Sequence, residues 1–223
     1  MCLLILAEKE FPPDDVLTLG EQQNRNGGGI AWVESDLVHW HKGLKAEEMK
    51  VYKKKGPPWM IHFRVATVGG DQERLCHPFP VTPDCSTELK GSAPSVLAHN
   101  GHYGSWSRMV LSALGPGMTC PVGPWSDTRG IAFLANVYGD GVLELIDEKV
   151  GILSAKNGLY RYGTGWVYFK ETDLIMSNNP FNRGGMVNGR DWGRNSNDRT
   201  INGSPWNAGY HQKHWQGSNF DHC

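Results

Sequence analysis

The chain has 223 residues, enough for one large domain that buries about 70% of the surface its unfolded form exposes. A hydrophobic fraction of 39% is typical of a globular protein rather than a disordered one. The 22 basic and 23 acidic residues give a formal net charge of -1, which provides no overall field to attract nucleic acid or an anionic membrane. We therefore expect neither of these as a partner.

The cysteines are spread along the chain without a Cys-x-x-Cys pair: Cys2, Cys76, Cys85, Cys120 and Cys223. Their odd number and their spacing fit neither a disulfide framework nor a zinc ribbon, so we expect free thiols and no metal site. The first apolar run, Leu-Leu-Ile-Leu-Ala, is far too short to cross a bilayer, and no charged segment precedes it as in a signal peptide. These features predict a cytoplasmic protein.

The first half of the chain favours strands separated by loops. Residues 2–7 form a short apolar run that predicts a buried strand, and the prolines and aspartates of residues 11–15 favour a loop. A glycine cluster then leads into a strand within residues 24–33, and residues 36–43 alternate like its hairpin partner. We expect next, in order, a helix over 45–55, a strand over 59–70, a loop over 71–94 and a short buried strand over 95–101.

The second half contributes helices and closing strands. Residues 105–114 and 126–139 predict helices, the second with Ser126 or Asp127 as its N-cap, and residues 142–151 predict a third short one. Strands are expected over 158–163, 165–171 and 173–178. Residues 179–223 are rich in Asn, Gly and Trp without periodicity and predict an irregular tail. The chain is thus expected to be an α+β protein with one domain over residues 1–178 and a C-terminal tail over 179–223.

Cys2, directly after the initiator methionine, has two interpretations. It can be a small hydrophobic residue that opens a strand, or, if Met1 is removed, a first residue that carries both a thiol and a free α-amine. An α-amine has an unperturbed pKa of about 7.7–8.0, close to the working pH at which a general base is most effective. Such a residue could attack an amide with its own amine as the base.

Other segments could supply what an attack on an amino-acid amide requires. The side-chain amide of Asn100 and the backbone N–H of Gly101 are two donors suited to an oxyanion. The guanidinium of Arg64 could bind a carboxylate through both oxygens, and Asp127 could bind an ammonium group. Each feature alone has an ordinary structural explanation, namely a turn, an ion pair or a helix cap.

The order of these segments resembles a known family. Cys2, Asn-Arg-Asn-Gly-Gly-Gly at 24–29, His-Phe-Arg-Val-Ala-Thr-Val-Gly at 62–69, Leu-Ala-His-Asn-Gly at 97–101 and Ser-Asp-Thr at 126–128 follow one another as in class II glutamine amidotransferase domains. These are N-terminal nucleophile hydrolases, and the resemblance runs to about Asn178. It is greatest to compact, stand-alone members without an attached synthase. The family's fold is a four-layer αββα sandwich, which the resemblance therefore implies here.

The resemblance also implies roles for individual residues. Cys2 matches the nucleophile, Asn100 and Gly101 match the oxyanion pair, and Arg64 and Asp127 match the groups that bind the substrate's carboxylate and α-amine. Two more candidates for substrate binding, Thr67 and His77, lie in family-like segments. Asn26 stands where relatives often have Asp, and we expect it to shape a turn.

Three functions remain open at this point. The first is hydrolysis of the glutamine side-chain amide through a γ-glutamyl thioester, without a cofactor, with the ammonia released or passed to a separate synthase or acceptor protein. The second is hydrolysis of another γ-glutamyl or small amide by the same residues. The third is a non-catalytic interaction protein that keeps the fold, which the tryptophan-rich tail suggests.

Overall fold

The computed structural model describes residues 2–66 and 69–183. Its helices and strands are, in chain order, β1 (Leu3–Ala7), α1 (Asp14–Gln23), β2 (Gly28–Glu34), β3 (Leu37–Leu44), α2 (Ala46–Met49), β4 (Trp59–Phe63), β5 (Phe79–Pro80), β6 (Lys90–Ala93), β7 (Ser95–Asn100), α3 (Trp106–Ala113), α4 (Asp127–Tyr138), β8 (Lys149–Ser154), β9 (Gly158–Tyr162), β10 (Val167–Phe169) and β11 (Leu174–Met176). Short 3₁₀ helices are η1 (Lys50–Lys55), η2 (Glu73–Leu75), η3 (Asp140–Leu145) and η4 (Pro180–Arg183).

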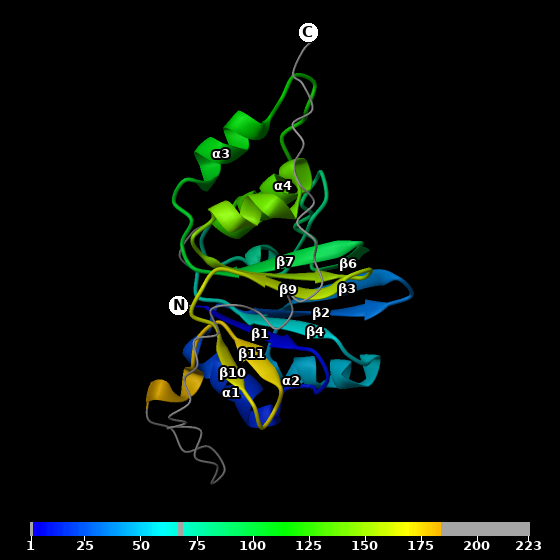
Figure 1. The fold of residues 1–223 in the computed structure, drawn as a ribbon, viewed down its shortest axis with the longest axis vertical. Coiled ribbons are helices and arrows are strands. Elements are labelled where there is room, and N and C mark those ends of the chain that lie inside the picture. Colours follow the sequence, from blue (N-terminus) through cyan, green and yellow to red (C-terminus); the bar gives the residue numbers. More distant parts are fainter. Residues whose placement is uncertain (1, 67–68, 184–223) are drawn as a thin grey trace.

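The described strands form two antiparallel sheets. The seven-stranded sheet has the order β10-β11-β1-β4-β2-β3-β6, and the four-stranded sheet has the order β5-β7-β8-β9. In Figure 1, α3 and α4 lie above the four-stranded sheet, while α1 and α2 lie below the seven-stranded one. The prediction of a mixed protein with α and β elements is confirmed.

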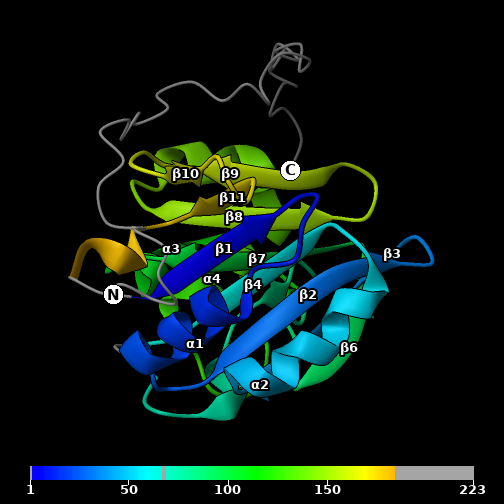
Figure 2. The same cartoon turned by 90° about the horizontal axis from the view of Figure 1, so that it is seen from below.

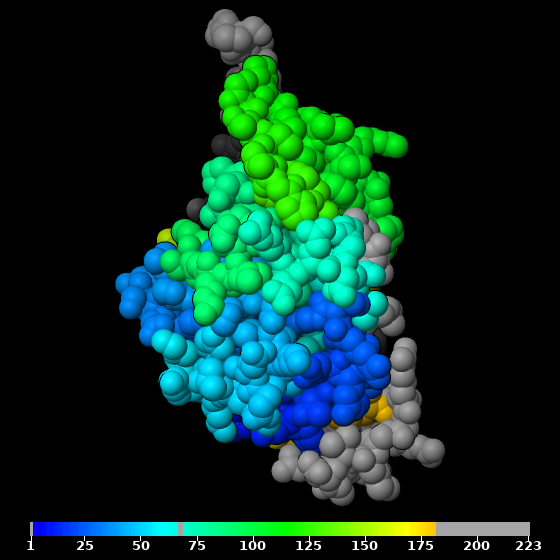
Figure 3. Space-filling view, turned by 180° about the vertical axis from the view of Figure 1, so that it is seen from behind, coloured from blue at the N-terminus to red at the C-terminus, as the bar shows by residue number. Residues whose placement is uncertain are grey.

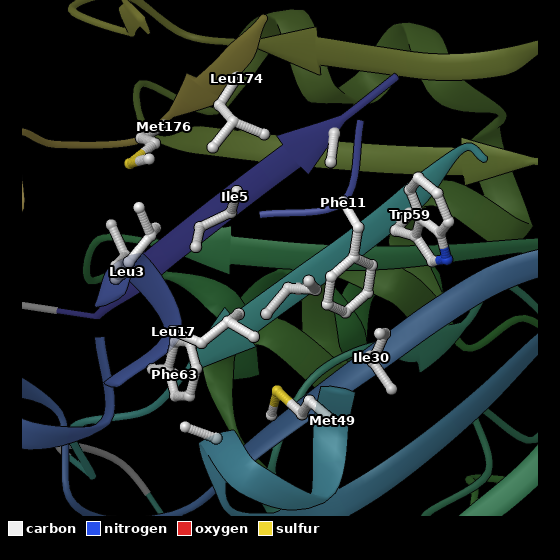
Figure 4. Packing of buried hydrophobic residues seen from close by; sticks show 14 of the residues in the cluster. Leu3, Ile5, Phe11, Leu17, Ile30, Met49, Trp59, Phe63, Leu174 and Met176 are labelled. Atoms are coloured by element: carbon white, nitrogen blue, oxygen red, sulfur yellow. The ribbon is translucent and has the colours of Figure 1, made fainter. Parts of the chain in front are cut away.

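Apolar side chains join the helices to the sheets and the sheets to each other. Val16 and Leu17 of α1 and Met49 of α2 pack on the outer face of the seven-stranded sheet. Figure 2 shows the two helices on this face, and Figure 4 shows Leu17 and Met49 among the packed side chains. A second cluster joins α3 and α4 to the four-stranded sheet. A third lies between the sheets: Leu4, Leu6, Ala31, Val38, Trp40, Met60, Ala93, Val96, Ala98, Leu153 and Trp166. The burial of this apolar surface is the main stabilising contribution to the fold.

Several elements differ from the expectations. Strands β5 and β6 form within the expected loop over 71–94, because they pair with β7 and β3 of the two sheets. Residues 14–23 form helix α1 where no helix was predicted: Asp14 and Asp15 occupy its first turn, where carboxylates are favourable, and Val16 and Leu17 supply its buried side. The helix expected over 142–151 is only half correct, because η3 ends at Leu145 and β8 begins at Lys149. Pairing with β7 and β9 keeps β8 extended, and no local sequence window contains that information.

The register of β1 places the start of the chain near two strand ends. Leu3 of β1 pairs with Phe63, the last residue of β4, so Cys2 lies beside the segment that follows β4. Ile5 pairs with Met176, the last residue of β11, on the other side of β1. Residues far apart in the sequence therefore meet at one edge of this sheet.

Candidate functional site

Cys2 lies at the edge where β1 begins. Its Sγ accepts a hydrogen bond from the Val65 backbone N–H at 3.3 Å and lies 3.6 Å from the Val65 carbonyl oxygen. Burial raises the pKa of the Cys2 thiol, while the Val65 backbone and the positive charge of Arg64 act in the opposite direction. The thiol is therefore partly enclosed yet has a donor in place for its ionised form.

A small pocket opens beside this thiol. About 270 Å³ of space that no atom fills lies within it, including the part that is open to solvent. The residues that line it come from both sheets, the loop before β5 and the start of α4: Cys2, Arg64, Val65, His77, His99, Gly101, Ser126, Asp127 and Thr128. Five of the seven residues proposed from the sequence are thus brought together.

Arg64 is buried, with 3% of its surface exposed, and the glycine-rich loop holds its backbone. The Arg64 N–H donates to the Gly27 carbonyl at 2.9 Å, and the Asn26 N–H donates to the Arg64 carbonyl at 3.0 Å. Asn26 Oδ1 also accepts from the Ala66 N–H at 3.0 Å, so Asn26 shapes this turn as expected. Gly27 has a φ of +88°, which favours glycine, and a Cβ there would lie 2.8 Å from Cys76 Sγ. The loop fixes the arginine's backbone and carries no phosphate-binding pattern.

Asp127 occupies the first position of α4, and its carboxylate already accepts two backbone hydrogen bonds. Oδ1 accepts from the Thr128 N–H at 2.9 Å, and Oδ2 accepts from the Tyr103 N–H at 3.3 Å. Ser126 caps the helix by accepting from the Arg129 N–H at 3.2 Å. His102 Nδ1 lies 3.8 Å from Oδ2. The result is an oriented negative charge at the wall of the pocket, where a cationic group could bind.

Gly101 lines the pocket, whereas Asn100 lies next to it at the end of β7. An ideal Cβ on Gly101 would lie 1.8 Å from Glu148 Oε2, so this carboxylate occupies the space that a side chain would need. Glu148 Oε1 in turn accepts from the His102 N–H at 3.1 Å. The Asn100 side-chain nitrogen donates to Ser177 Oγ and Asn178 Oδ1. Both of its hydrogens therefore point toward the segment after β11.

Three buried histidines cluster at the pocket: His77 and His99 line it, and His62 packs against His77. The sequence indicated only His77 for the site. The rings of His62 and His77 lie 3.9 Å apart between centroids, and the His99 N–H donates to His77 Nδ1 at 3.5 Å. His99 Nδ1 lies 3.1 Å from Thr128 Oγ1. Burial lowers the pKa of His62 to about 3 and the pKa values of His77 and His99 below the ordinary one. The cluster is therefore neutral near pH 7.

Some expectations lie outside the described residues or concern ligands. Thr67 and residues 184–223 of the tail fall outside them. Among residues 2–66 and 69–183, no group of three or more His, Cys, Asp or Glu side chains could hold a metal ion. The same part of the chain contains no helix with the length and apolar character needed to span a membrane.

Sequence reasoning missed several residues that line the pocket. Val65, His99, Ser126 and Thr128 belong to its wall. All four lie within the motifs, but none was assigned to substrate binding. His99 Nε2 has no hydrogen-bond partner among the described residues. Their membership of the motifs is the signal that could have identified these four.

Comparison with known proteins gives matches at the level of structure. No protein-family model matches the chain, and no curated protein sequence does. The glutamine phosphoribosylpyrophosphate amidotransferase of B. subtilis, complexed with ADP and GMP, matches with a TM-score of 0.53 and 17% identity over 82% of this chain and 43% of that one. A structure described as the allosteric regulatory enzyme of purine biosynthesis matches with the same values.

The chain thus spans less than half the length of these solved structures. At this identity the similarity shows a shared fold. That fold is the one found in a glutamine amidotransferase, the class of protein that the sequence motifs resemble.

Proposed function

We propose that the protein is a class II glutamine amidotransferase or glutaminase in which Cys2, after removal of Met1, hydrolyses the side-chain amide of glutamine. One observation carries the proposal: Cys2, Arg64, Asp127 and Gly101 line a single small pocket although they lie far apart in the sequence. The structural match to a glutamine amidotransferase supports the same class. The proposal includes the four-layer αββα sandwich, which the order of helices and sheets supports.

The reaction proceeds in two halves. In the first, the Cys2 thiol gives its proton to the α-amine of the same residue, and the sulfur attacks the side-chain carbonyl carbon of glutamine. The tetrahedral intermediate collapses as the C–N bond breaks, and the nitrogen leaves as ammonia with the transferred proton. In the second, water attacks the γ-glutamyl thioester, the C–S bond breaks, and glutamate and the thiol are released.

Two charged groups in the pocket lining, Arg64 and Asp127, would orient the substrate. Arg64 binds the α-carboxylate through two parallel N–H···O bonds, and Asp127 binds the α-ammonium. The Gly101 N–H and the Asn100 amide stabilise the oxyanion, and one such donor is typically worth about 2.7–4 kcal/mol of barrier. Thr67 and His77 complete the set of proposed substrate-binding residues, with His77 in the pocket wall as a neutral ring.

A separate acceptor protein for the ammonia is part of the proposal. Four exposed apolar side chains lie on α3 and the segment after it: Met109, Leu111, Met118 and Val122, with 36%, 70%, 44% and 89% of their surface exposed. Helix α3 projects from the body of the molecule in Figure 1, and the region around it forms the green lobe of Figure 3. Exposed apolar side chains gathered on a projecting segment could contact a partner protein, which also supports the alternative of a non-catalytic interaction protein on the same fold.

An assay of ammonia release from glutamine tests the proposal. The parent, Cys2→Ala and the matched control Cys120→Ala, whose thiol is exposed, are compared at equal concentration. We expect release by the parent and the control, none by Cys2→Ala, and a covalent adduct of a glutamine-like diazoketone at residue 2. Equal release by the parent and Cys2→Ala would refute the enzyme proposal. Turnover of other γ-glutamyl amides without turnover of glutamine would favour the second substrate class, and a mature chain that retains Met1 would contradict the role of the α-amine.

A further inference from the structure

The side-chain amide of Asn100 belongs to a closed triangle of hydrogen bonds. Its Nδ2 donates to Ser177 Oγ at 2.8 Å and to Asn178 Oδ1 at 2.8 Å. Ser177 Oγ donates to the same Asn178 Oδ1 at 2.8 Å. An amide nitrogen carries two hydrogens, so in this arrangement Asn100 has none left for a substrate oxygen.

Ser177 is the fixed corner of this triangle. Its backbone N–H donates to the Leu4 carbonyl at 2.8 Å, and its Oγ accepts from the Leu4 N–H at 3.0 Å. Lys149 Nζ donates to the Ser177 carbonyl. Ser177 is fully buried, whereas Asn178 is only partly buried. A change in the triangle therefore occurs most easily at Asn178.

A second arrangement keeps all three bonds. The oxygen and nitrogen of an amide are nearly equal in size, so Asn100 and Asn178 can each turn by about 180° with every heavy-atom position preserved. Asn178 Nδ2 would then donate to Asn100 Oδ1 and Ser177 Oγ, and Ser177 Oγ would donate to Asn100 Oδ1. The hydroxyl would still accept from the Leu4 N–H. The number of hydrogen bonds in the triangle is the same in both arrangements.

The two arrangements differ in what Asn100 presents on its other side. In the structure this side carries Oδ1, and none of the described residues donates a hydrogen bond to it. Rotation of the Asn100 amide by about 180° therefore breaks no hydrogen bond to a described residue on this side. After the turn the same side carries Nδ2 with both hydrogens, on the residue that directly precedes Gly101 of the pocket lining.

We propose that Asn178 is a positioning residue that switches Asn100 between a closed orientation, with its amide hydrogens on Ser177 and Asn178, and a working orientation that offers them to the substrate's oxyanion. The inference rests on the proposed function, since the oxyanion forms only on a bound amide. The negative oxygen favours the working orientation because it attracts the amide hydrogens as charge develops. The stabilising donor is thus supplied mainly in the transition state.

Two substitutions at one position test the switch. Asn178→Asp keeps the shape but supplies only acceptors, so it holds the Asn100 hydrogens and removes the working orientation. We expect its kcat to fall about 10²–10³-fold, the usual effect of losing one oxyanion donor, with KM nearly unchanged. Asn178→Ala removes the constraint and leaves Asn100 free to turn, so its kcat should stay within about tenfold of the parent. If Asn178 had only a structural role, kcat would be lower for Asn178→Ala than for Asn178→Asp, because Asp preserves the packing better than Ala. A kcat for Asn178→Ala as low as that for Asn178→Asp would overturn the inference.

Two further measurements separate the switch from the nucleophile and from the proposed function. Alkylation of Cys2 by iodoacetamide is a displacement without an oxyanion, so its rate should be the same in the parent and both variants. Slower alkylation in Asn178→Asp, in step with its kcat, would place the defect at the thiol and overturn the inference. NMR should show slower solvent exchange of the Asn100 side-chain amide in Asn178→Asp than in Asn178→Ala. Absence of glutamine turnover in the parent would refute the proposed function alone, and equal exchange in the two variants would refute the switch.

Discussion

Asp127→Asn gives the most direct test of substrate recognition. The substitution removes the charge but keeps the shape, and the new side chain can still accept from the Thr128 N–H through its oxygen. The carboxylate is only 8% exposed, so water screens little of its attraction for an ammonium group. A hydrogen bond to a charged group is worth about 1.5–3 kcal/mol. Since about 1.4 kcal/mol corresponds to a factor of ten, we expect KM for glutamine to rise about 10- to 140-fold with little change in kcat.

The substitution also has a predictable effect on folding that must be separated from recognition. The amide nitrogen cannot accept from the Tyr103 N–H, which now donates to Oδ2, and the first turn of α4 loses a negative charge. These losses amount to about 1–2 kcal/mol and should lower Tm by a few degrees. The matched control is Asp36→Asn, on an exposed turn whose φ of 61° suits asparagine.

The assay compares glutamine with 5-amino-5-oxopentanoate, which is glutamine without its α-amine. Initial rates of ammonia release are measured for the parent, Asp127→Asn and Asp36→Asn with both substrates. The rise in KM caused by Asp127→Asn should largely disappear with the analogue, because the analogue lacks the α-ammonium group that the Asp127 carboxylate would bind. The same penalty with both substrates would show that Asp127 acts through the fold, and the assigned role would be wrong.

Three other predictions concern buried titratable side chains, and each is tested by measuring Tm. The folded chain keeps His62 neutral down to a pKa of about 3 while the unfolded chain binds a proton below about 6.5, so stability falls between these values as the pH decreases. His62→Phe should reduce the fall of Tm as the pH decreases, and the same dependence of Tm on pH as in the parent would contradict this prediction. Burial lowers the pKa of Lys42 to about 7 from 10.5, so the unfolded chain binds more protons between these values and stability rises with pH there. Lys42→Met should remove that rise. A Tm difference between the parent and Lys42→Met that does not depend on pH would contradict this prediction. Arg129 donates to the carbonyls of Asp84, Cys85, Val122 and Pro124, so Arg129→Lys should cost about 3 kcal/mol or more and lower Tm by at least about 6 °C. A Tm within about a degree of the parent would contradict this.

Local sequence signals predicted those elements whose pattern is short and periodic. The apolar run of β1, the hairpin of β2 and β3, and the Ser126 cap of α4 all form as expected. Helix α1 was missed because the prolines before it suggested a loop, although Pro13 is its N-cap residue and the helix begins directly after it. Strand β8 was missed because its extended form depends on pairing with β7 and β9.

The candidate site was predictable to the extent that its residues belong to motifs. Arg64, Gly101 and Asp127 were identified by residue type and order, and they line the pocket with Cys2. The contact of Asn100 with Ser177 and Asn178 was not predictable, because it joins residues nearly eighty positions apart. Such a contact depends on how the two sheets stack, which no spacing along the sequence specifies.

The antiparallel register explains why motifs so far apart meet. In an antiparallel sheet the start of one strand lies beside the ends of its neighbours. β1 begins after Cys2, and its neighbours β4 and β11 end before Arg64 and Ser177, so Cys2, Arg64 and Ser177 share one edge. The other sheet contributes Asn100 and Gly101 from the end of β7. A register shift of one residue between β1 and β4 would turn Cys2 to the opposite face and separate it from Val65 and the pocket. The apolar packing of β1 on both faces therefore positions the thiol in the site as well as stabilising the fold.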